Sequence, residues 1–198
     1  MAAEPTGLLL AAGRGTRFDP SGRVLKLLSR ANRGPHAGAC LAAAAARTLI
    51  ASLPRVIAVV RPVDSDAQRQ LQTILRSEGC GLVVCDDADA GISASIACGV
   101  RAAEQASGWI IALADMPALA PSTVRAVTQA LLQGALTAAP VYQGQRGHPV
   151  GFAAGLRPQL LALTGDTGAR ELLASFPPQL IAVDDPGVVY DVDMKEQS

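Results

Sequence analysis

The sequence predicts a single α/β domain in which a mostly parallel sheet is covered on both faces by helices. Short apolar runs alternate with longer helical patterns along most of the chain. These short runs are continuously apolar, as parallel strands buried on both faces usually are. A chain of 198 residues can form one sizeable core but hardly two. Because we find no internal repeat, low-complexity linker or domain boundary, we expect residues 1–198 to form one domain.

The elements follow from the order of these patterns. The predicted strands are 7–12, 55–60, 82–86, 109–115 and 179–184. The predicted helices are 41–51, 65–77, 93–106, 121–134 and 168–175. Pro121 near the start of one helix and Gly134 beyond its end are typical helix boundaries. Residues 136–152 predict extended segments with a turn at Gly144 and Gly147.

Composition favours a compact protein without net charge, in which any anion must be bound by positive side chains close to it. The chain has 17 Lys and Arg residues against 17 Asp and Glu residues, so nothing attracts it overall to nucleic acid or to an anionic membrane. Its first residues, MAAEPTG, lack a basic segment followed by an apolar signal core, and no apolar run reaches the roughly 18 residues that span a bilayer. We therefore expect a cytoplasmic protein that binds neither nucleic acid nor membranes.

The four cysteines are expected to be buried, inert thiols. They form no C-x-x-C pair and have no histidine at zinc-finger spacing, and a cytosolic chain keeps its thiols reduced. They are Cys40, Cys80, Cys85 and Cys98.

Three segments rich in polar residues each follow a predicted strand. They are GRGTR after the first strand, CDDADAGIS after the third and DMP after the fourth. Open parallel sheets bind ligands beyond the carboxyl ends of their strands. We therefore expect these segments to meet at one site.

The first segment is suited to phosphate. Gly13 and Gly15 let main-chain N–H groups approach an anion, and Arg14, Arg17 and Lys26 add positive charge, which together suggest a triphosphate site. The alternative is a tight strand-to-helix turn with solvated arginines. The dinucleotide fingerprint is incomplete, because its third glycine is absent, and the Gly-Lys-Ser/Thr phosphate loop is absent too.

Aspartates supply candidate metal ligands. Asp115 ends an apolar strand, and Pro117 directs the chain out of the sheet there, so the carboxylate reaches the rim, where it can bind Mg²⁺. Asp191 and Asp193 share one face of an extended segment and could complete the metal site. The alternatives are a turn-capping role for Asp115 and an acidic, frayed tail for the other two.

The motifs in this order resemble a known family. LLLAAGRGTRF…LKLL, GISASIACGV, ALADMP, RGHPVGF, GDTGAR and DVDMKE are similar to the molybdenum cofactor cytidylyltransferase group of nucleotidyltransferases. The resemblance implies a three-layer αβα Rossmann-like fold. It also implies an enzyme that binds CTP and Mg²⁺ and transfers CMP to the phosphate of molybdopterin, with release of pyrophosphate. A molybdoenzyme or a maturation factor is then the expected partner protein.

The resemblance also assigns residues. Its triphosphate loop covers Leu10, Ala11, Ala12, Gly13, Arg14, Gly15, Thr16 and Arg17, and its lysine corresponds to Lys26. Gly91, Ser93 and Ser95 lie near the base, and Asp115 binds the metal. Gly147, His148, Pro149 and Arg170 border the second substrate. Arg17, Lys26 and Asp115 would act in catalysis.

Two other classes stay open. One is a Rossmann-type oxidoreductase, which the missing third glycine disfavours. The other is a non-catalytic carrier of the molybdenum cofactor, because DVDMKEQ stands where the family has D-I-D-T-P-E-D. Base choice is open as well: the A-A-G loop and two serines favour CTP over GTP.

Overall fold

A computed structural model of the protein describes residues 4–15 and 24–192. Eight strands form one sheet: β1 (Thr6–Leu10), β2 (Val56–Val60), β3 (Gly81–Val84), β4 (Gly108–Leu113), β5 (Thr137–Tyr142), β6 (Gln145–Arg146), β7 (Val150–Ala153) and β8 (Gln179–Ala182). The α-helices are α1 (Leu41–Ile50), α2 (Asp66–Ser77), α3 (Ile92–Ala102), α4 (Pro121–Leu132), α5 (Arg157–Leu161) and α6 (Arg170–Ser175). Short 3₁₀ turns lie at η1 (Lys26–Leu28), η2 (Ala88–Ala90), η3 (Ala154–Leu156) and η4 (Pro186–Val189).

The sheet has the order β3-β2-β1-β4-β7-β5-β6, and β8 pairs with β5. Strands β1 to β4 pair with one another in parallel, whereas β7 runs antiparallel to both β4 and β5. The prediction of a mostly parallel sheet is therefore confirmed. The helical crossovers place β1 and β4 side by side in the middle of the sheet.

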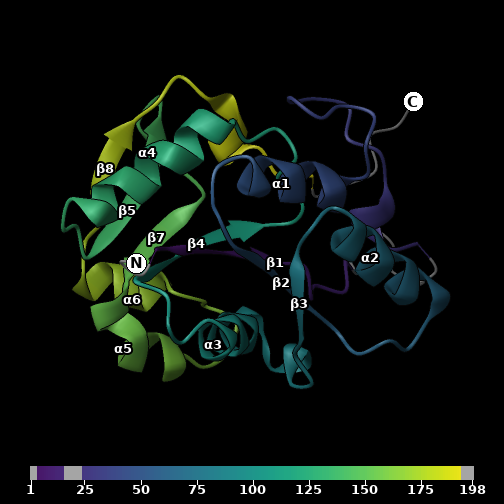
Figure 1. Ribbon diagram of the computed structural model, residues 1–198. Helices are drawn as coiled ribbons and strands as arrows, with labels where there is room; N and C mark the ends of the chain where they lie inside the picture. Colours follow the sequence, from purple (N-terminus) through teal and green to yellow (C-terminus); the bar gives the residue numbers. More distant parts are fainter. Residues whose placement is uncertain (1–3, 16–23, 193–198) are drawn as a thin grey trace.

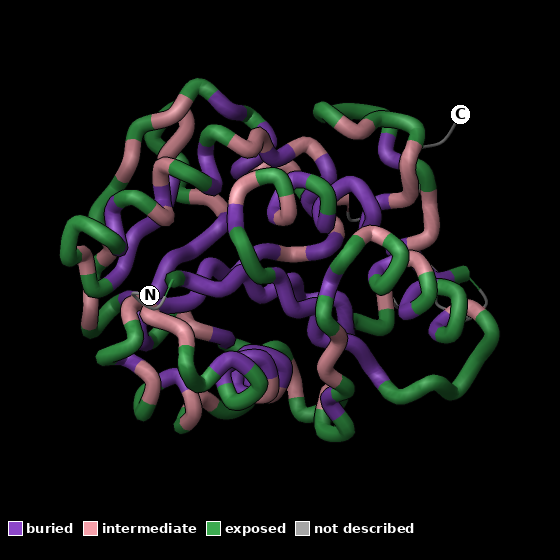
Figure 2. Tube along the Cα trace, viewed as in Figure 1, coloured by how far each residue is buried: buried purple, intermediate pink, exposed green. Residues whose placement is uncertain are grey.

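Helices cover both faces of the sheet (Figure 1). Helices α1, α2 and α4 lie on one face, and α3, α5 and α6 lie on the other. Along β1, Leu9 packs into the first layer, while Leu8 and Leu10 pack into the second. The continuous apolar run thus contributes to both cores, and every residue of β1 and β2 is buried (Figure 2). The three-layer αβα architecture is confirmed.

Some elements differ from those predicted. Helix α3 begins at Ile92 and ends at Ala102, four residues before the predicted end. Helix α5 was not predicted, because its five residues are too few to show a helical period. Within residues 4–15 and 24–192, no helix is both long and apolar enough to cross a membrane.

Asp185 fastens the last turn of the chain to helix α4. Its Oδ2 accepts hydrogen bonds from the Ala120 N–H at 2.9 Å and from the Thr123 hydroxyl at 2.6 Å. Its Oδ1 accepts the N–H of Gly187 at 2.9 Å. The side chain is almost fully buried, so these donors would lack partners without it.

We expect Asp185→Ala to lower the free energy of unfolding by about 2–4 kcal/mol, because three donors that are buried or partly buried lose their acceptor. Urea denaturation followed by circular dichroism measures this loss. The exposed neighbour Asp184 provides the control, since Asp184→Ala should change stability by less than about 0.5 kcal/mol. Equal effects of the two substitutions would contradict the fastening role of Asp185.

Candidate functional site

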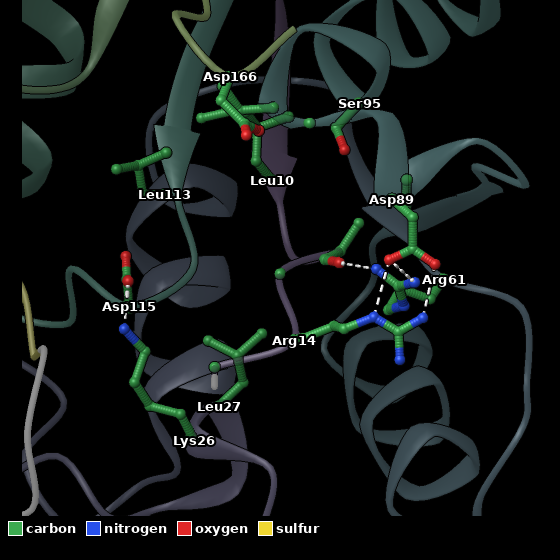
Figure 3. A pocket seen from close by; sticks show the side chains of 16 residues that line it. Leu10, Arg14, Lys26, Leu27, Arg61, Asp89, Ser95, Leu113, Asp115 and Asp166 are labelled. Atoms are coloured by element: carbon green, nitrogen blue, oxygen red, sulfur yellow. Dashed lines mark hydrogen bonds and ion pairs between the residues drawn. The ribbon is translucent and has the colours of Figure 1, made fainter. Parts of the chain in front are cut away.

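One cavity of about 580 Å³ opens at the carboxyl ends of the central strands. Residues from the loops after β1, β2, β3 and β4 line it, as expected for an open parallel sheet (Figure 3). Its lining contains Leu10, Ala12, Gly13, Arg14, Gly15, Lys26, Leu27, Arg61, Ala88, Asp89, Gly91, Ile92, Ser95, Leu113, Asp115 and Asp166. The three predicted polar segments therefore meet at one site.

Pairing of β1 with β4 brings the first and last of these segments together. Leu10 lies opposite Leu113 in the parallel register, and the N–H of Ala114 donates to the carbonyl of Leu10 at 3.1 Å. On the other side, the N–H of Ala11 donates to the carbonyl of Val59 at 2.9 Å. The glycine loop thus starts from a backbone held on both sides.

The described part of the glycine loop contains one glycine in a left-handed conformation and one with open space beside it. Gly15 has a φ of +65°, a conformation that favours glycine, and a Cβ there would lie 3.2 Å from Cβ of Lys26. A Cβ on Gly13 would meet no atom within 4 Å, so this backbone is open to a ligand. Thr16 and Arg17 lie outside the described residues, so their roles stay predictions.

Lys26 and Asp115 form an ion pair across the cavity floor. Nζ of Lys26 lies 2.6 Å from Oδ2 of Asp115, and the two side chains are only 11% and 22% exposed. The turn η1 supplies the lysine, and the loop after β4 supplies the aspartate. Lys26, which the sequence assigned to phosphate binding, and Asp115, which it assigned to metal binding, are therefore neighbours.

A second charge cluster, formed by Arg14, Asp89 and Arg61, was not predicted. Asp89 accepts from Nε of Arg14 at 2.7 Å and from the Arg61 guanidinium at 2.5 Å. These two arginines, in that order, hold the pKa of Asp89 well below its usual range. Arg61 is buried and also donates to the carbonyl of Ala12 at 3.0 Å. Asp89 is therefore the shared ion-pair partner of both arginines. The sequence could have indicated Arg61, because this residue directly follows strand β2 and the other site segments also follow strands.

The assigned base-proximal residues divide into two groups. Gly91 and Ser95 line the cavity. Ser93 is fully buried and its hydroxyl donates to the carbonyl of Thr164 at 3.1 Å, so it is not among the lining residues. Ala11 likewise packs into the core rather than into the cavity. Asp166, which belongs to the same GDTGAR segment as Arg170, lines this cavity.

The segment Gly147–His148–Pro149 lies beside this site without lining the cavity. The N–H of His148 donates to the carbonyl of Val188 at 2.9 Å. Burial lowers the pKa of His148, an effect that a backbone hydrogen bond of Ile111 and the negative charge of Asp115 partly offset. The imidazole is therefore neutral at pH 7 and near Asp115. Arg170 begins α6, is exposed and is not among the cavity-lining residues.

The end of the described chain runs alongside Asp115. The N–H of Val192 donates to the carbonyl oxygen of Asp115 at 3.1 Å, which places Asp191 next to this loop. Asp193 lies outside the described residues. In the part of the chain that the structure describes, no three His, Cys, Asp or Glu side chains are grouped closely enough to hold a metal ion by themselves.

The cysteines are free thiols: Cys80 and Cys85 are buried, and Cys40 and Cys98 are partly buried. Burial raises the pKa of Cys80 to about 11, so its thiol stays protonated at neutral pH. The sequence predicted that all four thiols are buried, which holds for Cys80 and Cys85 but not for Cys40 and Cys98.

Comparison with known proteins identifies the family. Nicotine blue oxidoreductase of Paenarthrobacter nicotinovorans is 32% identical over 97% of this chain and 93% of its own. The crystal structure of Rv0371c from Mycobacterium tuberculosis H37Rv has a TM-score of 0.79 at 24% identity, covering 97% of this chain and 94% of that one. Its complex with manganese has a TM-score of 0.69 at 24% identity, covering 91% and 88%. The sequence profile of the MobA-like NTP transferase domain matches residues 7–181. The chain belongs to this MobA-like NTP transferase family.

Proposed function

We propose that the protein is a Mg²⁺-dependent nucleotidyltransferase that transfers CMP from CTP to the phosphate of a molybdopterin-type acceptor. One observation carries the proposal: the glycine loop, with the open backbone of Gly13, lines the same cavity as the Lys26–Asp115 pair. An anion-binding loop and a metal-binding carboxylate are the two parts that nucleotidyl transfer requires.

The donor set suits a hard divalent cation. Asp115 offers carboxylate oxygens at the rim, and the chain around Asp191 lies against it. Mg²⁺ is usually held by one or two carboxylates, with substrate phosphates and water completing its shell. When bound there, Mg²⁺ would supply positive charge that offsets the charge of the triphosphate. The manganese complex of Rv0371c supports a divalent metal in this fold.

The residues of this chain act mainly by position and charge. An oxygen of the acceptor phosphate forms a bond to the α-phosphorus of CTP, and the bond from that phosphorus to the bridging oxygen of the β-phosphate breaks. Lys26, which lines the cavity, would neutralise the leaving pyrophosphate, and Arg17 is assigned the same role from the sequence. The N–H groups of residues 13–16 would hold the β- and γ-phosphates. Because the acceptor phosphate is already anionic, no strong general base is required.

The acceptor is assigned to the side of the cavity where the Gly147–Pro149 segment meets Asp115. His148 is neutral and close to Asp115, which suits a group that contacts an acceptor rather than one that supplies charge. Arg170, by contrast, would need a large acceptor to reach from α6 to the cavity, because it does not line the cavity. The choice of molybdopterin rests on the family resemblance. A molybdoenzyme or maturation factor would receive the product, and the free thiols suit a cytoplasmic location.

A second candidate function is hydride transfer with a nicotinamide dinucleotide. The observation that favours it is the name of the relative, nicotine blue oxidoreductase, which aligns over nearly the whole chain. The cavity would accept the pyrophosphate of a dinucleotide on the same glycine loop. The missing third glycine of the dinucleotide fingerprint counts against it.

The transfer reaction is tested with CTP, GTP and ATP, each with molybdopterin and Mg²⁺. Pyrophosphate release should be fastest with CTP, and a clear preference for GTP would defeat the cytidylyl assignment. Asp115→Asn should lower the rate about 100-fold or more, because the site loses its metal-binding charge. Asp184→Asn, on an exposed residue outside the cavity, should leave the rate unchanged. Full activity of folded Asp115→Asn would reject the role of Asp115.

Asp89 forms an ion pair with Arg14. A phosphate that binds the Arg14 guanidinium must therefore compete with the Asp89 carboxylate. We therefore expect Asp89→Asn to strengthen pyrophosphate binding by about 2- to 5-fold at low salt, and less at high salt, because the cavity loses one negative charge. Isothermal titration calorimetry measures the change. Asp86→Asn removes the same charge from the same loop outside this cavity and should have little effect. Weaker pyrophosphate binding in Asp89→Asn would contradict the competition.

Hydride transfer is tested by mixing the protein with NADH or NADPH and recording nicotinamide fluorescence. The nucleotidyltransferase proposal predicts no shift at micromolar protein and no cofactor consumption with quinone acceptors. Saturable enhancement of the fluorescence, together with oxidation of the cofactor, would instead establish the oxidoreductase function.

A further inference from the structure

Asp166 is a cavity-lining carboxylate that the proposed reaction does not use. Figure 3 shows it with Ser95 at the end of the cavity away from Lys26. Within the part of the chain that the structure describes, no donor pairs with its carboxylate, in contrast to Asp89 and Asp115, which are both ion-paired. A ligand in this cavity would therefore meet a carboxylate free to accept hydrogen bonds.

The backbone around Asp166 fixes its place. A Cβ on Gly91 would overlap Oδ1 of Asp166 and would lie 2.6 Å from the carbonyl of Gly165. Gly91 also has a φ of +105°, so glycine is favoured there for two reasons. The N–H of Ser93 donates to the carbonyl of Gly165 at 3.3 Å, which ties this loop to the start of α3. Asp166 is thus held against the first turn of α3.

Charge determines which part of a nucleotide can lie beside Asp166. Phosphates are repelled by an unpaired carboxylate, and they are attracted to Lys26 and the glycine loop at the other end. Leu10 and Leu113 line the cavity between the two ends. Apolar walls with a few convergent polar groups are suited to a heterocyclic base. The base consequently extends toward Gly91, Ser95 and Asp166.

We infer that Asp166 selects nucleotides whose base carries an exocyclic amino group, through a hydrogen bond from that group to its carboxylate. In the proposed substrate this donor is N4 of cytosine, which carboxylates accept in other recognition sites. Uracil presents carbonyl oxygens on both sides of its single N–H, so a carboxylate opposite it faces an acceptor. This inference rests on the proposed function and names the determinant of its base preference.

The test compares CTP with the triphosphate of 2-pyrimidinone riboside, which lacks only the amino group. Binding is measured by isothermal titration calorimetry with Mg²⁺, without an acceptor. The folded wild-type protein should bind CTP roughly 5- to 150-fold more tightly, the range expected for one good base contact. Asp166→Ala should bind the two nucleotides within about 3-fold of each other, since the acceptor is gone. Asp166→Asn should reduce the preference for CTP over UTP. The reason is that an amide can donate a hydrogen bond to the uracil carbonyl as well as accept one from the cytosine amino group.

Asp184→Asn serves as the charge-matched control and should keep the wild-type preference. Thermal unfolding of each variant verifies that the fold is intact. Equal binding of CTP and the 2-pyrimidinone nucleotide to wild type, or a preference that persists in Asp166→Ala, would overturn the role of Asp166 while leaving nucleotidyl transfer intact. Absence of binding by every nucleoside triphosphate would instead contradict the proposed function, and this inference with it.

Discussion

The parallel pairing of β1 with β4 is the constraint on which the site depends. It aligns Leu10 with Leu113, so the loops that follow these strands leave the sheet at the same edge and at the same height. The Lys26–Asp115 ion pair, 2.6 Å long and largely buried, then joins the two loops. Neither loop contains the whole site, and each would be an ordinary strand exit alone. Their chemistry arises because the sheet holds them side by side.

The cavity divides its charges between its two ends. Lys26 and Asp115 lie at one end with the open glycine backbone, and the unpaired Asp166 lies at the other. The largely buried Lys26 would contact the phosphates of a nucleotide bound at that end. The Arg14–Asp89–Arg61 cluster closes the side of the cavity and restrains the described part of the loop. This division gives a nucleotide one favoured direction in the cavity.

Patterns along the chain were enough to predict the layers of the fold and the convergence of three loops. The apolar runs encode the strands locally, and their carboxyl ends must meet in a parallel sheet. Side-chain partners could not be predicted, because Asp89 lies 75 positions from Arg14 in the sequence and 28 positions from Arg61. The sequence likewise assigned Ser93 and Ser95 to the same base site. In the structure Ser93 hydrogen-bonds to Thr164, whereas Ser95 lines the cavity. Helical phase decides between them, and it depends on where α3 begins.

The central claim is that one nucleotide spans the glycine loop and Asp115, with a divalent ion at that carboxylate. Crystals grown with Mn²⁺ and a non-hydrolysable α,β-methylene analogue of CTP test it directly through the anomalous signal of manganese. The account predicts a manganese peak coordinated by Asp115 and by phosphate oxygens of the analogue, with its phosphates on the backbone of Gly13 and Gly15. A nucleotide bound elsewhere, or a manganese ion bound away from Asp115, would contradict the account.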